Sequence, residues 1–89
     1  MSVACPCCGN LTMPDDGSFP GSFVICPVCF WEDDDVQLAD PDFAGGANRP
    51  SLNQARANYR TFGAKDDRAR SLVRPPKDSE LSSTNDETA

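Results

Sequence analysis

The sequence predicts a small α+β domain stabilised by a metal ion, in which a zinc-ribbon or rubredoxin-like knuckle hairpin is followed by one or two helices. Three observations predict it. Cysteines occur as two closely spaced pairs, an apolar stripe with helical spacing follows them, and the chain has 89 residues with 38% hydrophobic content. A chain of this size buries little apolar surface, so it commonly depends on a metal, a disulfide or a partner.

The two cysteine turns are Cys5-Pro6-Cys7-Cys8-Gly9 and Cys26-Pro27-Val28-Cys29-Phe30, with seventeen residues between Cys8 and Cys26. Two residues separate the outer cysteines of each turn, which lets both sulfurs face one point. Four thiolates from two such turns form the tetrahedral shell of a structural Zn²⁺ site. We therefore expect Zn²⁺ to be bound by Cys5, Cys8, Cys26 and Cys29. Iron is a less favoured occupant, because rubredoxin-like sites usually carry glycine after both pairs and Phe30 follows the second pair here.

The segment between the two turns predicts a hairpin. Residues 11–13 begin a strand, residues 14–18 are dense in turn formers, and residues 22–25 are rich in the β-branched and aromatic side chains of a strand. Pairing of residues 11–13 with residues 22–25 would bring the two cysteine turns together at one end of the hairpin.

A helix is predicted to begin after Ser51, which with Gln54 has the spacing of a capping box. Gly63 suits the left-handed position that ends a helix. A second, short helical turn is expected over residues 66–73, capped by Asp66 or Asp67. The apolar stripe of the main helix consists of Leu52, Ala55, Tyr59 and Phe62.

The chain divides into three regions. Residues 1–48 form the cysteine-rich part, residues 49–76 form a helical part packed on it within one domain, and residues 77–89 are expected to be a disordered acidic tail. Charge follows this division: residues 1–48 contain eight acids and no Lys or Arg, whereas residues 49–77 contain all eight basic residues. The simplest interpretation is that the basic part folds against the acidic part. A nucleic-acid-binding face is the alternative, formed by Arg49, Arg56, Arg60, Lys65, Arg68, Arg70 and Arg74.

The start of the chain lacks the basic and apolar regions of a signal peptide, and no apolar run is long enough to span a bilayer. We therefore expect a cytoplasmic protein without membrane contact. Thiols stay reduced in that compartment, so paired cysteines there more often hold a metal. The odd number of five cysteines agrees, because they cannot all pair within one monomer.

Several segments together resemble the cysteine-rich CPCC family of small bacterial proteins. The resemblance covers roughly residues 4–76 and implies a cysteine-rich, zinc-binding bacterial domain. It carries no catalytic residue over to this chain. The matching segments are Cys5-Pro6-Cys7-Cys8-Gly9, Ile25-Cys26-Pro27-Val28-Cys29-Phe30-Trp31-Glu32-Asp33-Asp34, Asp40-Pro41-Asp42-Phe43-Ala44-Gly45-Gly46-Ala47-Asn48, Ser51-Leu52-Asn53 and Val73-Arg74-Pro75-Pro76.

The sequence favours a binding function over catalysis. It contains no histidine, and four cysteine ligands would leave a metal without an open position for substrate. We expect a protein interaction module that is not an enzyme, with an unidentified protein partner. A third hypothesis is a thiol redox or metal sensor through Cys7, the fifth cysteine, acting as a reactive thiol. The expected interaction surface consists of Trp31, Glu32, Asp33, Asp34, Arg56 and Arg60.

Overall fold

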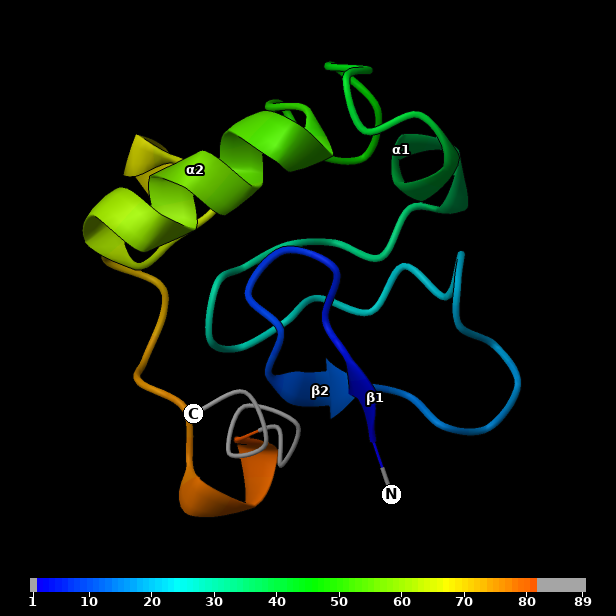
Figure 1. Ribbon diagram of the computed structural model, residues 1–89, viewed down its shortest axis with the longest axis vertical. Helices are drawn as coiled ribbons and strands as arrows, with labels where there is room; N and C mark the ends of the chain where they lie inside the picture. The colour runs from blue at the N-terminus through cyan, green and yellow to red at the C-terminus, as the bar shows by residue number, and fades with distance from the viewer. Residues whose placement is uncertain (1, 82–89) are drawn as a thin grey trace, which may run out of the picture.

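The computed structural model describes residues 2–81. Its two short strands lie at one end of the molecule and its two α-helices at the other, with the cysteine turns between them (Figure 1). Within residues 2–81, no helix has the length and hydrophobicity needed to cross a membrane. In chain order the elements are β1 (Val3–Ala4), β2 (Leu11–Met13), α1 (Asp35–Ala39), α2 (Leu52–Phe62) and the 3-10 turns η1 (Asp67–Ala69) and η2 (Asp78–Glu80).

The first cysteine turn connects β1 to β2. These strands pair antiparallel, with Val3 opposite Met13 and Ala4 opposite Leu11, and the register shifts between the two pairs. The strand at residues 11–13 is therefore confirmed. Its expected pairing with residues 22–25 is wrong, because β2 pairs with the segment that precedes the first turn.

The second cysteine turn closes a hairpin of its own. Residues 22–25 are not extended throughout, since Phe23 has φ of 61°. They pair with the segment immediately after the turn, through Phe23 N to Asp33 O (3.0 Å), Asp33 N to Val24 O (2.9 Å) and Cys26 N to Trp31 O (2.9 Å). Residues 22–25 were predicted as one strand of a sheet, but only an isolated bridge between Ile25 and Glu32 forms. Closing this short local loop costs less chain entropy than pairing across residues 14–21.

Helix α1 begins at Asp35, the last residue of an acidic run at residues 32–35, and was not predicted. The Asp34 carboxylate caps its start by accepting from Val36 N (2.8 Å) and Gln37 N (3.2 Å). The buried Gln37 side chain then ties α1 to the following loop by donating to Phe43 O, Asn48 O and Pro50 O. The acidic residues at this position are thus part of the fold rather than simply solvated.

Helix α2 has the predicted position. Ser51 Oγ accepts from Gln54 N (3.1 Å), and Gly63 ends the helix with φ of 85°. The Gln54 side chain bonds Asn58 instead of completing the capping box. Along the predicted stripe, Leu52 and Ala55 are fully buried in one cluster with the cysteine turns, and Tyr59 packs against its edge. Packing of this stripe holds α2 against the cysteine-rich part of the chain.

The chain after α2 stays ordered further than predicted. Asp66 is the capping residue of η1, and its carboxylate accepts from Ala69 N (2.9 Å). Arg74 donates to both carboxylate oxygens of Glu80 at 2.8 Å, and η2 lies beside β2 (Figure 1). The expected disordered tail therefore does not include residues 77–81, because this two-bonded pair fixes them. The rest of that prediction, residues 82–89, lies outside the described residues.

Candidate metal centre

The structure brings together the four cysteines that the spacing predicted. The sulfurs of Cys5, Cys8, Cys26 and Cys29 all lie within 4.8 Å of one another. Cys5 Sγ lies 3.6 Å from Cys29 Sγ, and Cys8 Sγ lies 3.8 Å from Cys26 Sγ. Zn–S bonds of about 2.3 Å in a tetrahedron separate the sulfurs by about 3.8 Å. All five cysteines are free, so the four sulfurs have the spacing of a metal shell and not of disulfides.

Both cysteine turns have the same backbone geometry. In the first, Gly9 N donates to Cys5 O at 2.8 Å; in the second, Phe30 N donates to Cys26 O at 2.8 Å. Gly9 has φ of 81° and Phe30 has φ of 72°. A left-handed backbone is easy for glycine but strained for a bulky L-residue. The second turn therefore keeps a phenylalanine at a position where glycine would fit without strain.

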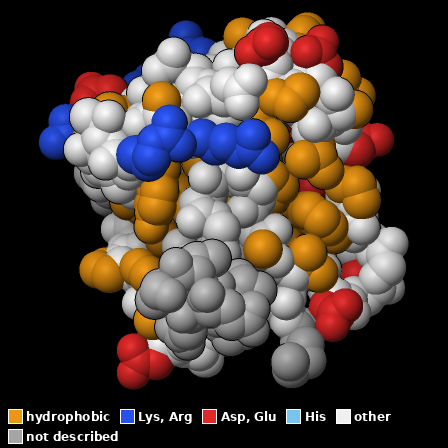
Figure 2. Space-filling model, viewed as in Figure 1, with side chains coloured by type: hydrophobic (Ala, Val, Ile, Leu, Met, Phe, Trp, Pro, Cys, Tyr) orange, Lys and Arg blue, Asp and Glu red, His pale blue; other side chains and the backbone are white. Residues whose placement is uncertain are grey.

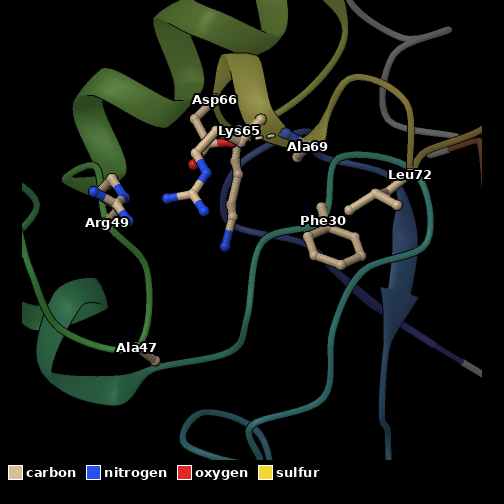
Figure 3. Close-up of a pocket in the computed structure, with 8 residues that line it drawn as sticks. Phe30, Ala47, Arg49, Lys65, Asp66, Ala69 and Leu72 are labelled. Atoms are coloured by element: carbon tan, nitrogen blue, oxygen red, sulfur yellow. Dashed lines mark hydrogen bonds between the residues drawn. The ribbon is translucent and has the colours of Figure 1, made fainter.

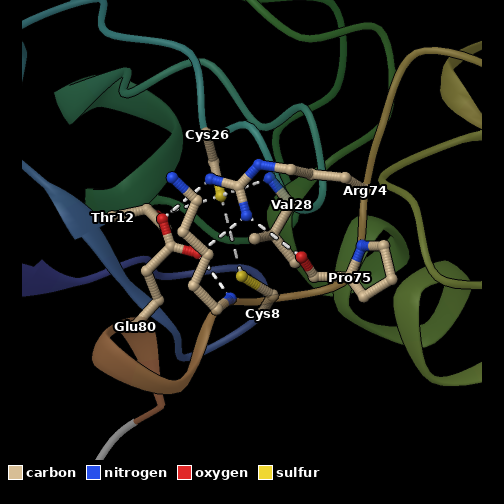
Figure 4. Close-up of polar contacts among 8 residues, drawn as sticks. Cys8, Thr12, Cys26, Val28, Arg74, Pro75 and Glu80 are labelled. Carbon is tan, nitrogen blue, oxygen red and sulfur yellow. Dashed lines mark hydrogen bonds and ion pairs between the residues drawn. The ribbon is translucent and has the colours of Figure 1, made fainter.

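Hydrogen-bond donors surround the sulfurs of the second turn. Thr12 Oγ1 donates to Cys26 Sγ at 3.0 Å and Val28 N to the same sulfur at 3.4 Å (Figure 4). Trp31 N donates to Cys29 Sγ at 3.4 Å. Such donors favour the thiolate form, which is the form that binds a metal. The role of Thr12 could not be predicted from the sequence, because an isolated threonine in a short strand is typical of any edge strand.

The thiols also perturb one another. Interaction with Cys29 is the largest cause that lowers the pKa of Cys26. Interaction with Cys26 is the largest cause that raises the pKa of Cys5 and that of Cys29. The pKa of Cys8 is lowered as well, so the four thiols form one electrostatically coupled group. A soft divalent cation would relieve the repulsion among four adjacent thiolates, so the donor set suits such an ion.

Burial separates the ligand sulfurs from most of the solvent. Cys5, Cys26 and Cys29 are each at most 1% exposed, and Cys8 is half-buried. The Arg56 side chain covers the back of the first turn by donating from Nε to Pro6 O at 2.8 Å. The site is thus closed on the core side and is nearest to solvent at Cys8.

The expected interaction surface is only partly a surface. Trp31 and Asp33 are fully buried, and Asp34 is 7% exposed. Trp31 belongs to the core beside the cysteines, and Asp33 accepts from Ser22 N and Ser22 Oγ. These three side chains therefore cannot contact a partner, and this part of the prediction is wrong. Of the remaining residues, Glu32 and Arg56 are half-buried and Arg60 is exposed.

Cys7 lies outside the sulfur cluster and is 7% exposed. A reactive thiol needs solvent access as well as a lowered pKa. The burial of Cys7 does not favour the sensor hypothesis, since Cys8 is the more accessible thiol of the same turn.

The basic and acidic parts of the chain do not neutralise one another through ion pairs. In the part of the chain that the structure describes, the ion pairs are Arg70–Asp67 (3.1 Å) and Arg74–Glu80 (2.8 Å). Both lie within residues 66–80, so neither uses an acid of residues 1–48. The helical part is held by apolar packing and by hydrogen bonds such as that of Arg56.

Comparison with known proteins agrees with the cysteine pattern. No curated protein matches the chain. The family model described as cysteine-rich CPCC matches residues 3–80, which include both cysteine turns, both α-helices and the Arg74–Glu80 pair. The chain therefore belongs to the cysteine-rich CPCC family.

Proposed function

We propose that the chain is a zinc-ribbon-like domain in which Cys5, Cys8, Cys26 and Cys29 bind one structural Zn²⁺ ion, and that it acts as a protein interaction module in the cytoplasm. The observation that carries the proposal is the convergence of four sulfurs within 4.8 Å. Metal bound only by the folded state adds its binding energy to folding, roughly 10–16 kcal/mol in small zinc peptides. A chain of 89 residues benefits greatly from that contribution.

A structural role fits this donor set better than a catalytic one. Catalytic zinc sites generally keep three protein ligands and one open position, whereas four cysteines fill the shell. Three of the four sulfurs are almost fully buried, which keeps substrate away from the ion. We therefore propose a domain that is not an enzyme.

Binding to another protein is supported by apolar side chains on the surface of a small domain. Phe23 is 59% exposed, Val36 57% and Leu72 60%. Single exposed apolar residues are common, but grouped ones mark interaction surfaces. Figure 2 shows the larger group of hydrophobic side chains along one side of the viewed face, with further ones beside the Lys and Arg side chains.

Nucleic-acid binding is a second candidate. The observation that favours it is that Arg49, Arg60 and Arg68 are exposed and form no ion pair within residues 2–81. Unpaired cations of this kind are what phosphate contacts require.

Metal analysis tests the leading proposal. Purified protein is expected to contain one zinc per chain, to be colourless, and to lose its far-UV circular dichroism when a strong chelator removes the metal. Cys29→Ala is expected to abolish stoichiometric binding. Cys7→Ala is the matched control, since Cys7 is buried but is not in the sulfur cluster. A red iron-containing protein, or a fold that survives complete metal removal, would contradict the proposal.

A further inference from the structure

A pocket of about 400 Å³ opens beside the second cysteine turn and lies outside the metal centre. It collects residues from three separate parts of the chain: the second turn, the loop before α2, and residues 65–72, which follow α2 and include η1. The pocket, here called the Phe30 pocket, is lined by Phe30, Ala47, Arg49, Lys65, Asp66, Arg68, Ala69 and Leu72 (Figure 3).

Three cations line this pocket and give it a positive charge. Arg49 and Arg68 are exposed, and Lys65 is half-buried, with its Nζ donating to Asn48 Oδ1 at 3.0 Å. None of the three forms an ion pair within residues 2–81. The single lining acid, Asp66, already caps η1 by accepting from Ala69 N. The charges of the lining side chains therefore add up to a site for an anion.

The other side of the pocket is apolar. Figure 3 shows the Phe30 ring next to Leu72, across the opening from Arg49 and Lys65. Leu72 is 60% exposed, so much of its side chain is free to be covered by a ligand. Lys65 Nζ lies 5.5 Å from the centre of the Phe30 ring, which joins the cationic and apolar sides.

The backbone at Phe30 gives independent support for a functional pocket. Phe30 has φ of 72°, at the position where the first turn carries Gly9. A backbone conformation strained in this way costs of order 1–3 kcal/mol, and such conformations are frequent at binding sites. Glycine would satisfy the turn, so the backbone geometry does not require the Phe30 ring, which instead lines the pocket.

We propose that the Phe30 pocket binds an acidic peptide segment that carries a large apolar side chain. The carboxylates of the peptide contact Arg49, Lys65 and Arg68, and its apolar side chain packs on Phe30 and Leu72. This inference rests on the proposed function as a protein interaction module and identifies the chemistry of the partner.

A peptide fits the pocket better than a nucleic acid does. Nucleic acid needs a run of cations that follows a phosphate backbone, and stacking surfaces for successive bases. This pocket has three cations, one acid and an aliphatic leucine, so it offers neither a run of cations nor stacking surfaces for successive bases.

Titration of the isotope-labelled, zinc-loaded full chain tests the inference by NMR. The probe is a short peptide of alternating acidic residues and Leu or Phe, and the expected result is saturable shifts at the amides of Phe30, Lys65 and Leu72. Two control peptides, one with amides in place of the acids and one with Ser in place of the apolar residues, are expected to bind at least about tenfold more weakly. Shifts that the three peptides cause equally, or that only oligothymidylate causes, would overturn the proposal.

Charge reversal locates the site. Arg68→Glu is expected to weaken binding of the probe peptide by at least about tenfold. Arg60→Glu is the matched control, because Arg60 is an exposed arginine that does not line the pocket. Equal weakening by the two variants would show nonspecific charge attraction and would overturn the proposal. Zinc content and the amide spectrum are measured for each variant. A folded, zinc-loaded protein that does not bind the peptide contradicts this inference alone. A folded protein that contains no metal contradicts the proposed function.

Discussion

The two cysteine turns share a backbone fold and differ in what surrounds them. In each, the amide of the first cysteine donates to the carbonyl of the residue that follows the turn, from Cys5 N to Asn10 O at 2.8 Å and from Cys26 N to Trp31 O at 2.9 Å. The second turn is the more enclosed, because both of its ligand cysteines are fully buried. In the first turn Cys8 is half-buried. A repeated local motif therefore does not give two equivalent halves of the site.

The difference arises from what the rest of the chain packs against each turn. The second turn receives Lys65 N at Cys29 O (2.8 Å) and Arg74 N at Pro27 O (3.3 Å). Within residues 2–81, the sulfur-directed hydrogen bonds from Thr12 Oγ1 and from backbone amides also end on Cys26 and Cys29. The first turn is held from outside, by Arg56 at Pro6 O and by Asn10 at Tyr59. The second turn therefore receives more hydrogen bonds from the rest of the described chain than the first turn does.

Among changes that test the difference between the two turns, Thr12→Val is expected to have the largest effect, a loss of metal affinity. It keeps the shape of the side chain and removes the donor to Cys26. Loss of an outer-shell hydrogen bond typically lowers metal affinity 10–100-fold, or about 1.4–2.7 kcal/mol. Competition with a chromogenic chelator measures the change. Thr61→Val is the matched control, because the Thr61 hydroxyl donates to Ala57 O on the exposed side of α2. Equal affinities in wild type and Thr12→Val would show that the donors at the second turn do not tune the metal.

Exchange of the residues that end the turns is expected to give a smaller and asymmetric effect. Gly9→Ala places a Cβ at φ of 81° in otherwise open space, so only backbone strain opposes it, at about 1–2 kcal/mol of unfolding free energy. Phe30→Gly relieves comparable strain but loses the contact with Lys65, so a net change below about 1 kcal/mol is expected. Urea unfolding at fixed free zinc measures both. A larger loss for Phe30→Gly than for Gly9→Ala would mean that the ring, rather than the backbone, stabilises the second turn.

The sequence predicted the sulfur cluster well because its geometry is local. Two residues between the outer cysteines fix how each turn presents its sulfurs, and only the meeting of two turns depends on the fold. Helix α2 was predicted for the same reason, since Ser51 and Gly63 act within one turn of the residues that they cap. Strand pairing was predicted wrongly although the observed pairings are local, because the β-branched and aromatic composition of residues 22–25 did not reveal their partner.

The acidic run at residues 32–35 shows more clearly what could not be predicted from the sequence alone. Four consecutive acids suggest a solvated surface, yet Asp33 and Asp34 are buried because backbone amides and Ser22 solvate their carboxylates in place of water. The donors from residues 36 and 37 are local, because Asp34 caps α1, but those from Ser22 and Ala47 are distant in sequence and no local pattern predicts them. The Phe30 pocket was missed for a similar reason, since its lining residues meet only when the second turn, the loop before α2 and residues 65–72 fold together.

The smallest effect is expected from Glu80→Gln, which removes the partner of Arg74 beside the second turn (Figure 4). The Arg74 guanidinium and the Lys77 amide lower the pKa of Glu80 from 4.5 to about 2. A carboxyl group whose pKa is lower in the folded state stabilises the fold at pH values above its unfolded pKa. This contribution is lost as the pH falls toward the folded pKa. The stability difference between wild type and Glu80→Gln is therefore expected to be small and constant from pH 8 to pH 5, and to shrink only below about pH 4.5. Urea unfolding at several pH values measures it. A difference that already changes between pH 8 and pH 5 would mean that Glu80 acts through the metal centre, whose thiols compete with protons in that range, rather than through Arg74.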